Sequence, residues 1–295
     1  MNEREYLAER FEEHRPRLRA VAYRMLGSLS EADDAVQETW LRLGRAEYHE
    51  VVNLGGWLTT ALGRVCLTML RSRRRRGEES LETYVPDPIV GETDADAEGG
   101  PEEEALLADS ISLALLVVLE ALSPAERLAF VLHDLFSVPF DEIATVVGRS
   151  GPATRQLASR ARRRVRGAEP PADADPPEQR RVVRAFLAAA RDGDFEALLA
   201  VLDPEVVLRV DGGATGASAL VRGAHSVASG ATAFARVTEQ VRPMLVNGAL
   251  GSVALRDGRP SSIAAFTVAG GRVVAMTVLS DPARIAALDL PLLPA

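Results

Sequence analysis

Apolar residues recur every three or four positions through most of residues 1–76, the spacing of amphipathic helices. Pro16 marks a kink or restart, because proline lacks the N–H that a helix interior needs. Ser30 is a suitable N-cap for the helix that follows it. The segment Asn-Leu-Gly-Gly at 53–56 then breaks the chain before a further helix that ends in arginines. The pattern predicts an all-helical first block.

Residues 110–167 show the helical spacing again. After a leucine-rich helix, Ser123 is followed by proline and, three positions on, by Glu126, which together form a capping-box signature. Two short amphipathic stretches follow within residues 140–166, separated by Gly148. Because glycine permits a tight turn, this segment predicts a helix-turn-helix.

The pattern changes in residues 178–295. Two helical stretches are followed by strand-like runs of alternating residues at 206–210, 251–257, 261–270 and 272–279. The pairs Asp257-Gly258 and Gly270-Gly271 are typical hairpin turns. The predicted fold class is therefore multidomain: two all-α domains, then an α+β cone with an interior cavity.

Two segments lack this periodicity. Residues 77–109 are rich in acidic residues, glycine and proline, and residues 168–177 are rich in proline and acid, so both are predicted to be linkers. The aromatic and proline-containing stretch at 84–88 is a stiff exception. The predicted organisation is 1–76, 77–109, 110–167, 168–177 and 178–295.

Composition narrows the class. The chain has 295 residues, of which 47% are hydrophobic and 26% charged, so it can bury proper cores. Its single cysteine, Cys66, excludes an internal disulfide and a cysteine-based zinc cluster. No charged-then-apolar leader and no apolar run of about 18 residues is found, so we expect a soluble cytoplasmic protein without membrane contact. No metal or cofactor is expected.

The net charge of −8 hides a strong asymmetry. Residues 1–76 carry 14 arginines against 11 acids, and residues 110–167 carry 8 against 5. Residues 77–109 carry 12 acids and no base, whereas residues 168–295 carry 12 arginines against 14 acids. The acidity therefore belongs to one linker between two mildly basic blocks, a distribution that favours nucleic-acid binding by the blocks.

The second helix of the predicted helix-turn-helix carries the strongest binding signal. Seven arginines and no acid lie between Arg149 and Arg166. An ordinary amphipathic hairpin with a solvated arginine face is the alternative, but solvated faces usually mix signs. Arginine and glutamine on a recognition helix contact guanine and adenine edges, and further arginines hold phosphates. The predicted DNA-binding residues are Arg155, Gln156, Ser159, Arg160, Arg162 and Arg163.

Two blocks of this sequence resemble a known family. YRMLGS at 23–28, EADDAVQETWLR at 31–42 and the helix from Gly55 to Arg76 look like region 2 of extracytoplasmic-function sigma factors. The block from Leu122 to Val165 looks like region 4 of that family. The C-terminal domain resembles the SnoaL-like, ketosteroid-isomerase-like cone, a fusion that marks the SigJ-like subgroup.

The resemblance implies that the chain binds core RNA polymerase, through the β′ coiled coil and the β flap, and promoter DNA. The polymerase contact falls on Asp34, Gln37, Glu38 and Arg42. The minus-ten contact falls on Asn53, Trp57, Arg64, Arg71, Arg73 and Arg74, with the loop from His49 to Asn53 near a flipped base. Trp57 has core packing as its alternative. Region 4 reads the minus-thirty-five element.

The resemblance also gives the acidic linker a role. It implies a polyanion that occupies the nucleic-acid channels of the polymerase by mimicking single-stranded nucleic acid. A solubilising spacer remains the alternative, because charge-rich segments are disordered by default.

The C-terminal domain offers little for catalysis. Residues 168–295 contain no tyrosine, tryptophan or cysteine and only one histidine, His225. At most Asp211 is therefore left to serve as an acid–base or oxyanion group in this domain. We therefore expect that the chain is not an enzyme. A cavity lined by apolar residues could still bind an apolar small ligand.

In the subgroup this domain tunes the sigma regions in cis. The resemblance assigns that contact to Tyr84, Pro86, Pro88, Asp211, Gly212, Gly213, Asp281 and Pro282. The third glycine of the subgroup motif and its basic partner are missing here, so the tuning is expected to differ.

A sigma factor regulated in cis is the leading hypothesis. A ligand-responsive helix-turn-helix repressor is the first alternative, but it leaves EADDAVQETWLR unexplained. A SnoaL-type isomerase or cyclase is the second, and it would need acidic or tyrosine groups in the cavity.

Overall fold

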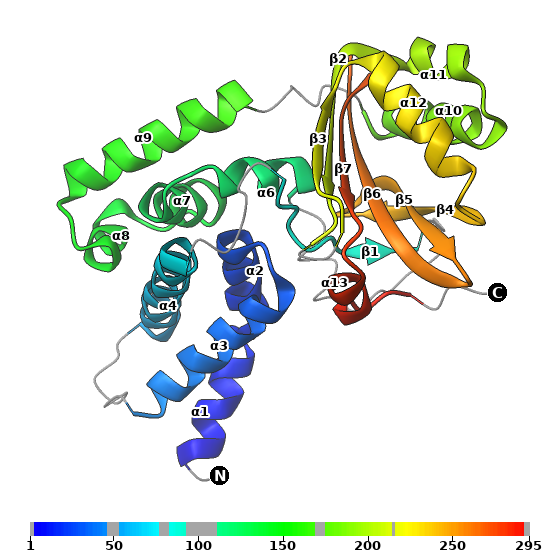
Figure 1. Cartoon of the computed structure of the whole chain (residues 1–295). Coiled ribbons are helices and arrows are strands. Elements are labelled where there is room, and N and C mark those ends of the chain that lie inside the picture. Colours follow the sequence, from blue (N-terminus) through cyan, green and yellow to red (C-terminus); the bar gives the residue numbers. More distant parts are fainter. Residues whose placement is uncertain are drawn as a thin grey trace. The chain divides into compact units, whose positions relative to one another are not determined.

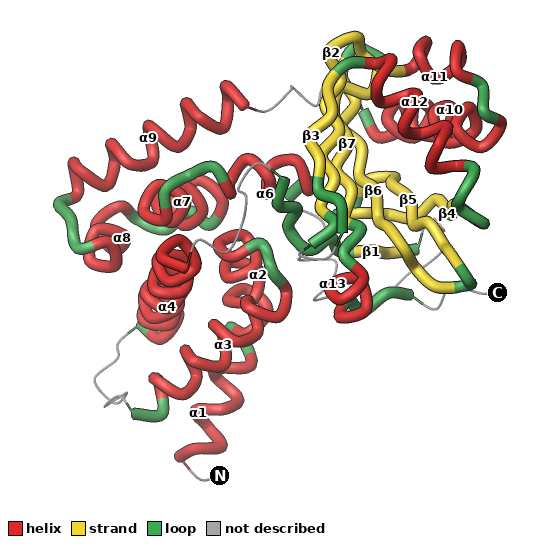
Figure 2. Tube along the Cα trace, viewed as in Figure 1, coloured by secondary structure: helices red, strands yellow, loops and turns green. Residues whose placement is uncertain are grey.

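The computed structural model describes residues 3–45, 53–76, 83–92, 111–168, 175–213 and 216–291. The chain divides into two compact units. The first unit comprises Met1–Glu79 with Val118–Ala168, and the second comprises Ser80–Val117 with Glu169–Ala295. Every strand of the described residues belongs to the second unit (Figure 2).

In the described residues, four helices form the first part of the first unit. They are α1 (Glu3–Glu12), α2 (Arg15–Leu26), α3 (Leu29–Leu43) and α4 (Leu54–Arg76). Pro16 lies in the first turn of α2, so the predicted restart is confirmed. The cap of α3 is Ser28 and not Ser30, because Leu29 is already helical and the Ser28 hydroxyl accepts the Glu31 N–H. The helix after the second break also begins earlier than predicted, since α4 starts at Leu54 and contains Gly55 and Gly56. Asn53 caps it, accepting the Gly56 N–H at 3.0 Å.

The second part of the first unit is the predicted helix-turn-helix block. Its elements are α6 (Leu113–Glu120), α7 (Pro124–Phe130), a π-helical turn η2 (Val131–Leu135), α8 (Phe140–Val147) and α9 (Gly151–Ala168). Residues 113–117 of α6 are grouped with the second unit. Ser123 and Glu126 form the predicted capping box. Gly148 ends α8 with φ +70°, as the predicted tight turn requires.

The second unit is the predicted α+β cone. Its helices are α10 (Pro176–Asp192), α11 (Phe195–Val201), α12 (Ala224–Ala235) and α13 (Pro282–Ala287). Its strands are β1 (Val90–Gly91), β2 (Leu202–Asp211), β3 (Ala219–Arg222), β4 (Gln240–Val246), β5 (Ala249–Arg256), β6 (Arg259–Ala269) and β7 (Arg272–Leu279). The sheet order is β1-β4-β5-β6-β7-β2-β3, with β2 and β7 parallel.

The two faces of this sheet are covered differently. Figure 1 shows α10, α11 and α12 gathered on one side, where Phe186, Leu198 and Phe266 join one buried core. Because side chains alternate along a strand, Ile263 and its partner Leu279 point to the opposite face, and both are fully buried there. That face carries α13 and the linker residues described below.

Three hairpin turns shape the sheet. The two predicted pairs have φ of +52° and +67° at Asp257-Gly258 and of +55° and +72° at Gly270-Gly271. A third, Asn247-Gly248, joins β4 to β5 with φ of +50° and +77°. Asparagine-glycine is a strong hairpin signal, and the sequence reasoning missed it together with β1, β3, β4, α12 and α13.

Candidate nucleic-acid interfaces and the linker contact

Helix α9 presents a polar stripe to solvent. Leu157, Ala158 and Ala161 are buried against the unit, and Thr154 continues this face. The exposed stripe opposite them consists of Arg155, Gln156, Ser159 and Arg163. Four of the six predicted contacts therefore lie where a major groove could receive them.

The other two predicted residues contact acids of their own block. Arg160 bonds Glu126 at 3.1 Å, and Arg162 bonds Asp134 at 2.6 Å. Arg164 also bonds Glu126, at 2.7 Å. Arg160 and Arg162 therefore fasten α9 to α7 and to η2 in this conformation.

Most of the predicted DNA-binding arginines of α4 also form contacts within the first unit. Arg64 donates to the Thr145 carbonyl at 3.5 Å, and Arg74 donates to the Leu122 carbonyl at 2.9 Å. Arg73 pairs with Glu31. Of the remaining predicted residues, Asn53 and Arg71 are exposed and Trp57 is half-buried. The loop residues 46–52, which include His49, lie outside the described residues.

Helix α3 offers a polar outer face. Asp34 and Gln37 are exposed, and Glu38 forms an i,i+4 ion pair with Arg42 at 2.8 Å. Leu41 lies among them with 45% of its surface exposed. The outer face of α3 therefore combines one exposed apolar side chain with four polar ones.

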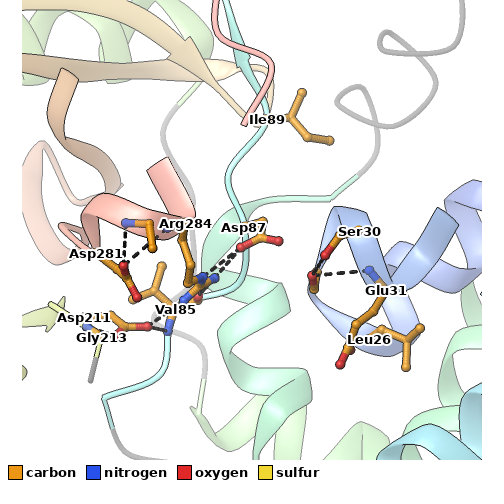
Figure 3. Close-up of polar contacts among 12 residues, drawn as sticks. Leu26, Ser30, Glu31, Val85, Asp87, Ile89, Asp211, Gly213, Asp281 and Arg284 are labelled. Atoms are coloured by element: carbon orange, nitrogen blue, oxygen red, sulfur yellow. Dashed lines mark hydrogen bonds and ion pairs between the residues drawn. The ribbon is translucent and has the colours of Figure 1, made fainter. Parts of the chain in front are cut away.

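In the second unit, Arg284 of α13 holds the linker. Its guanidinium donates to one carboxylate oxygen of Asp87 at 3.0 Å and to one of Asp211 at 2.8 Å, and it also donates to the Val85 carbonyl. The Tyr84 ring lies 4.9 Å from the guanidinium carbon. Figure 3 shows Val85, Asp87, Asp211 and Arg284 converging, and we call these four residues together with Tyr84 the linker clamp.

The linker clamp sets one guanidinium against two carboxylates in a largely buried site. Burial alone would lower the pKa of Arg284, but Tyr84, Asp87 and Asp211 together raise it. Asp211 additionally accepts the Val85 N–H at 3.0 Å. The guanidinium therefore remains charged and the linker backbone is fixed at both its N–H and its carbonyl.

Two groups of predicted contact residues, Asp211 to Gly213 and Asp281 to Pro282, meet beside the linker clamp. Asp211 accepts the Gly213 N–H at 3.0 Å, and Gly213 has φ +67°. A Cβ at Gly213 would collide with the Asp281 carboxylate, so this position requires glycine. Asp281 caps α13 and Pro282 occupies its first turn, which positions Arg284. Residues 214–215 lie outside the described residues.

Asn247 makes a second contact with the linker. Its N–H donates to the Ile89 carbonyl at 2.8 Å and its side-chain oxygen accepts the Ile89 N–H at 3.2 Å. Its side-chain nitrogen donates to the Ile111 carbonyl at 3.4 Å. One buried asparagine thus joins Ile89 to Ile111, which are 22 positions apart in the sequence. Beside it, Val90 of the linker pairs with Val246, which adds β1 to the edge of the sheet.

The interior of the cone is occupied by side chains. Phe186 and Phe266 lie 5.3 Å apart between their ring centroids within the core that α10, α11 and α12 cover. A pocket of about 310 Å³ lies at the start of α12, lined by groups that include His225 and Arg272. No contact among the described residues tests the predicted binding of an apolar ligand, so this binding stays a prediction.

In the described parts of the chain, no cluster of three or more histidine, cysteine or acidic side chains could hold a metal ion. Nor is any helix of those parts long and apolar enough to cross a bilayer.

Comparison with known proteins identifies the family. Residues 10–76 match Sigma-70 region 2 and residues 112–165 match Sigma-70, region 4. The ECF RNA polymerase sigma factor SigJ of Mycobacterium tuberculosis (strain ATCC 25618 / H37Rv) is 37% identical over 292 residues, 92% of this chain and 91% of SigJ. The chain belongs to the extracytoplasmic-function sigma factors. A probable sigma factor SigI of the same strain is 37% identical over 214 residues, 72% of each chain.

The likeness extends to the three-dimensional structure of this sigma factor. The crystal structure of Mycobacterium tuberculosis SigJ matches it with a TM-score of 0.77 at 33% identity, covering 96% of this chain and 100% of that one. The match therefore includes the C-terminal α+β domain. The predicted sigma blocks and the predicted fold class are confirmed.

Family membership fixes the function at the level of the family. The sigma factor directs promoter recognition and transcription initiation, and it binds RNA polymerase core and promoter DNA. Sigma factors supply recognition and are not enzymes, so the isomerase alternative is set aside together with the stand-alone repressor.

Three residues of these surfaces were missed in the sequence. Arg284 supplies a basic partner for Asp211, from the tail rather than from the glycine motif. The sequence pointed to Arg284 only through its position two residues after Pro282, in a segment that resembles the subgroup. Asn247 was signalled by the Asn-Gly pair, and Leu41 by an apolar residue off the buried stripe of α3.

Proposed function

We propose that the outer face of α3 binds the β′ coiled coil of the polymerase core, and that region 4 binds the β flap. Leu41 would be the apolar anchor of the α3 contact, with Asp34, Gln37 and the Glu38–Arg42 pair as its polar rim. Interfaces of this kind derive most of their affinity from a few central anchors. Because the polymerase works in the cytoplasm, we propose that the sigma factor does too.

We assign promoter reading to two helices. The exposed stripe of α9 reads the duplex minus-thirty-five element, with Gln156 and Arg155 near base edges and Arg163 on the backbone. The α4 surface around Asn53, Trp57 and Arg71 holds the minus-ten element, joined by Arg64, Arg73 and Arg74 when they leave their present partners. The basic charge of both blocks supports this assignment.

Transcription with purified components tests this assignment directly. The sigma factor and core polymerase, incubated with a promoter library, should yield transcripts whose start sites share two upstream elements. Sequencing of the transcripts measures this. A Leu41→Ala variant should lose core binding, whereas Tyr6→Ala, which removes another exposed side chain, should retain it. Absence of any sigma-dependent transcript would contradict the proposal.

We further propose that the C-terminal domain restrains the sigma regions in cis by holding the linker. The linker clamp around Arg284 carries this proposal, because its acceptors come both from the linker and from the cone. The predicted Pro86 and Pro88 flank Asp87 and keep this stretch extended. Pro86, Asp87 and Pro88 are all buried.

Holding the linker shortens its reach. Residues 77–112, which precede α6, can extend to about 120 Å at about 3.4 Å per residue. While Asn247 joins Ile89 to Ile111, residues 90–110 no longer add to that distance. The minus-ten and minus-thirty-five elements lie about 85 Å apart, at about 3.4 Å per base pair. The cone therefore limits how easily one sigma factor spans a promoter.

Substitution of Arg284 tests the restraint. Arg284→Ala should raise promoter-dependent transcription several-fold and increase protease cleavage within residues 77–117, because two carboxylates and the Val85 carbonyl lose their donor. Arg284→Lys should fall between, since an ammonium cannot bridge both carboxylates as a guanidinium does.

Arg256→Ala is the matched control, because Arg256 is an exposed arginine of the same domain. It should leave both readouts unchanged. Unaltered transcription in Arg284→Ala would contradict regulation in cis, and reduced transcription would contradict restraint.

The acidic linker keeps its proposed role as a nucleic-acid mimic in the polymerase channel. Most of its acidic residues, at 77–82 and 93–110, lie outside the described residues. The charge of the segment is what supports this role.

A further inference from the structure

The first helix of the helix-turn-helix begins with an aromatic residue that contacts the recognition helix. Phe140 is the first residue of α8, and α8 packs beside the start of α9 (Figure 1). The guanidinium carbon of Arg155, in the second turn of α9, lies 5.8 Å from the centre of the Phe140 ring. A cation within about 6 Å of an aromatic face is attracted by the quadrupole of the ring. Arg155 therefore has a preferred position before any DNA is bound.

His133 covers one face of the same phenyl ring. The centroids of the two rings lie 3.7 Å apart and the rings are inclined by 28°, so the imidazole and the phenyl ring are stacked. Because the imidazole occupies one face at this distance, the other face is the one left to Arg155. His133, Phe140 and Arg155 thus form a stack of three side chains, which we call the Arg155 stack.

The position of His133 is fixed by an unusual stretch of backbone. His133 lies in the π-helical turn η2, and its Nδ1 bonds the Val138 carbonyl at 3.0 Å. Since a carbonyl oxygen only accepts, Nδ1 carries the hydrogen of this bond. Ser137, just before Val138, has φ +57°, a left-handed value that serine rarely adopts. Such π-helical turns and backbone outliers are costly, and they gather at functional sites.

The same turn also holds α9. Asp134, the residue after His133, accepts a bond from Arg162 of α9 at 2.6 Å. Two consecutive residues of η2 therefore hold the first residue of α8 and the second half of α9. The turn in this way sets the position of the Phe140 ring relative to the recognition helix.

The contact of Arg155 differs in kind from those of its neighbours on α9. Arg160 and Arg162 donate to carboxylates, which occupy the N–H groups that a base or a phosphate would need. Arg155 contacts a ring face, and this contact needs none of the five N–H donors of a guanidinium. An arginine can stack on a ring and present its planar donors to a bidentate acceptor at the same time. The Arg155 stack therefore leaves Arg155 free to bind DNA.

Ordering this guanidinium in advance favours base reading. Guanine offers two acceptors in the major groove, O6 and N7, which match the fork of an arginine. A free arginine side chain loses rotamer freedom when it is fixed on a base, and a side chain that is already ordered loses less. The benefit is largest where the geometry of the bound state is strict, as it is for a bidentate contact.

We infer that Phe140, held by His133, positions Arg155 to read one guanine of the minus-thirty-five element. Phe140 and His133 are positioning residues, which act through Arg155 and set part of the specificity at that base pair. The inference rests on the assignment of α9 to the minus-thirty-five element proposed above.

Holoenzyme assembled from core polymerase and full-length sigma factor variants tests this positioning. Affinity is measured for a promoter found by transcript sequencing and for versions of it in which each minus-thirty-five base pair is changed singly. Arg155→Ala should lower discrimination at one G·C pair about 5- to 150-fold, the range of a bidentate base contact. Phe140→Leu keeps the apolar bulk but removes the ring face, so discrimination at the same pair should fall about two- to fivefold. Phe140→Tyr keeps the ring face and should discriminate as well as wild type.

Combined substitutions show whether the ring acts through the arginine. In the Arg155→Ala background, Phe140→Leu should cause no further loss of affinity for the unchanged promoter, because no guanidinium is left to hold. His133→Asn keeps a donor for the Val138 carbonyl but removes the imidazole ring, so it should cause a smaller loss at the same base pair. If Phe140→Leu does not fold, His133→Asn in both backgrounds gives the same comparison.

Ile143→Val is the matched structural control. Ile143 is fully buried in α8, and loss of one methyl group there loosens the packing of the helix without removing a member of the Arg155 stack. This variant should have a lower melting temperature and unchanged discrimination at the G·C pair.

Three results would overturn the positioning role. They are discrimination in Phe140→Leu that equals or exceeds that of wild type, a loss spread evenly over all base pairs, and a loss that persists undiminished in the Arg155→Ala background. Full discrimination at every base pair in Arg155→Ala would overturn the assignment of α9 as well, which distinguishes failure of the proposed function from failure of the Arg155 stack alone.

Discussion

Individual arginine side chains have different roles in this sigma factor, and the groups around each side chain decide its role. Arg284 is buried among acids and holds a linker, whereas Arg163 stands exposed on α9 with solvent around it. The raised pKa of Arg284 means that its contribution to stability is complete below the pKa of an unfolded arginine. It is lost only as pH rises through the still higher folded value, so the linker clamp is insensitive to pH near neutrality.

Base reading and phosphate binding should separate at two residues of α9. Gln156→Ala should lower affinity for the preferred minus-thirty-five sequence by about 1–3 kcal/mol and leave other sequences little affected, because a bidentate base contact is lost. Arg163→Ala should weaken binding to all sequences and reduce the salt slope by about one. Titration of duplexes at several salt concentrations measures both. A uniform loss in Gln156→Ala would contradict base reading.

At the scale of elements, a capping box doubles as a helix-packing device. Glu126 caps α7 through Ser123 and also receives Arg160 and Arg164 from α9. Burial by itself would raise the pKa of Glu126, but bonds from Ser123 and the nearby arginines outweigh it and hold the pKa below its usual value. The same carboxylate therefore begins one helix and orients the recognition helix.

Acid should remove this stabilisation. Because the folded pKa lies below the unfolded one, the contribution of Glu126 is complete above about pH 4.3 and is lost as pH falls through the folded value. Glu126→Gln should cost about 1–3 kcal/mol of unfolding free energy at pH 7, and this difference should shrink towards zero in acid.

Denaturant titrations of wild type and Glu126→Gln at several pH values measure this. Glu142→Gln, an exposed glutamate on α8, is the control and should behave like wild type throughout. A stability difference that persists unchanged in acid would contradict the role of the Glu126 charge.

At the scale of the whole molecule, most of the linker belongs to the second unit although it connects the two parts of the first unit in sequence. Residues such as Val85 and Ile111 are buried with the cone, although the sigma regions lie on either side of them in sequence. Regulation in cis then needs no second protein, because the restraint and its target share one chain.

Removal of residues 168–295 should therefore raise transcription without abolishing core binding. The truncated chain keeps α3 and its exposed face, but its linker loses Arg284 and Asn247 and regains its full reach. Pull-down of core polymerase and transcription from one promoter measure the two properties separately. Unaltered transcription across several truncation end points would contradict regulation by the C-terminal domain.

The sequence alone predicted a good part of this architecture. Helical periodicity, the Ser123 and Glu126 capping box and the Gly148 turn depend on neighbours within a few positions, so local pattern was enough. The short β1 and β3 and the proline-containing β4 escaped prediction, because their partners, and not their composition, make them strands. The sequence predicts Ser30 as the cap where the structure has Ser28, because both serines suit an N-cap and local pattern places a helix boundary only to within one or two residues.

What the sequence by itself determined is the identity of the parts: two sigma blocks, an acidic linker and an α+β cone, each written in a local pattern of apolar residues and charge. What only the tertiary structure decided is how those parts engage one another. Arg284 meets Asp87 across almost two hundred positions, and Arg127 reaches the Met25 carbonyl across about one hundred. Such partners are chosen by packing, because a buried charge must find a counter-charge wherever the fold places one.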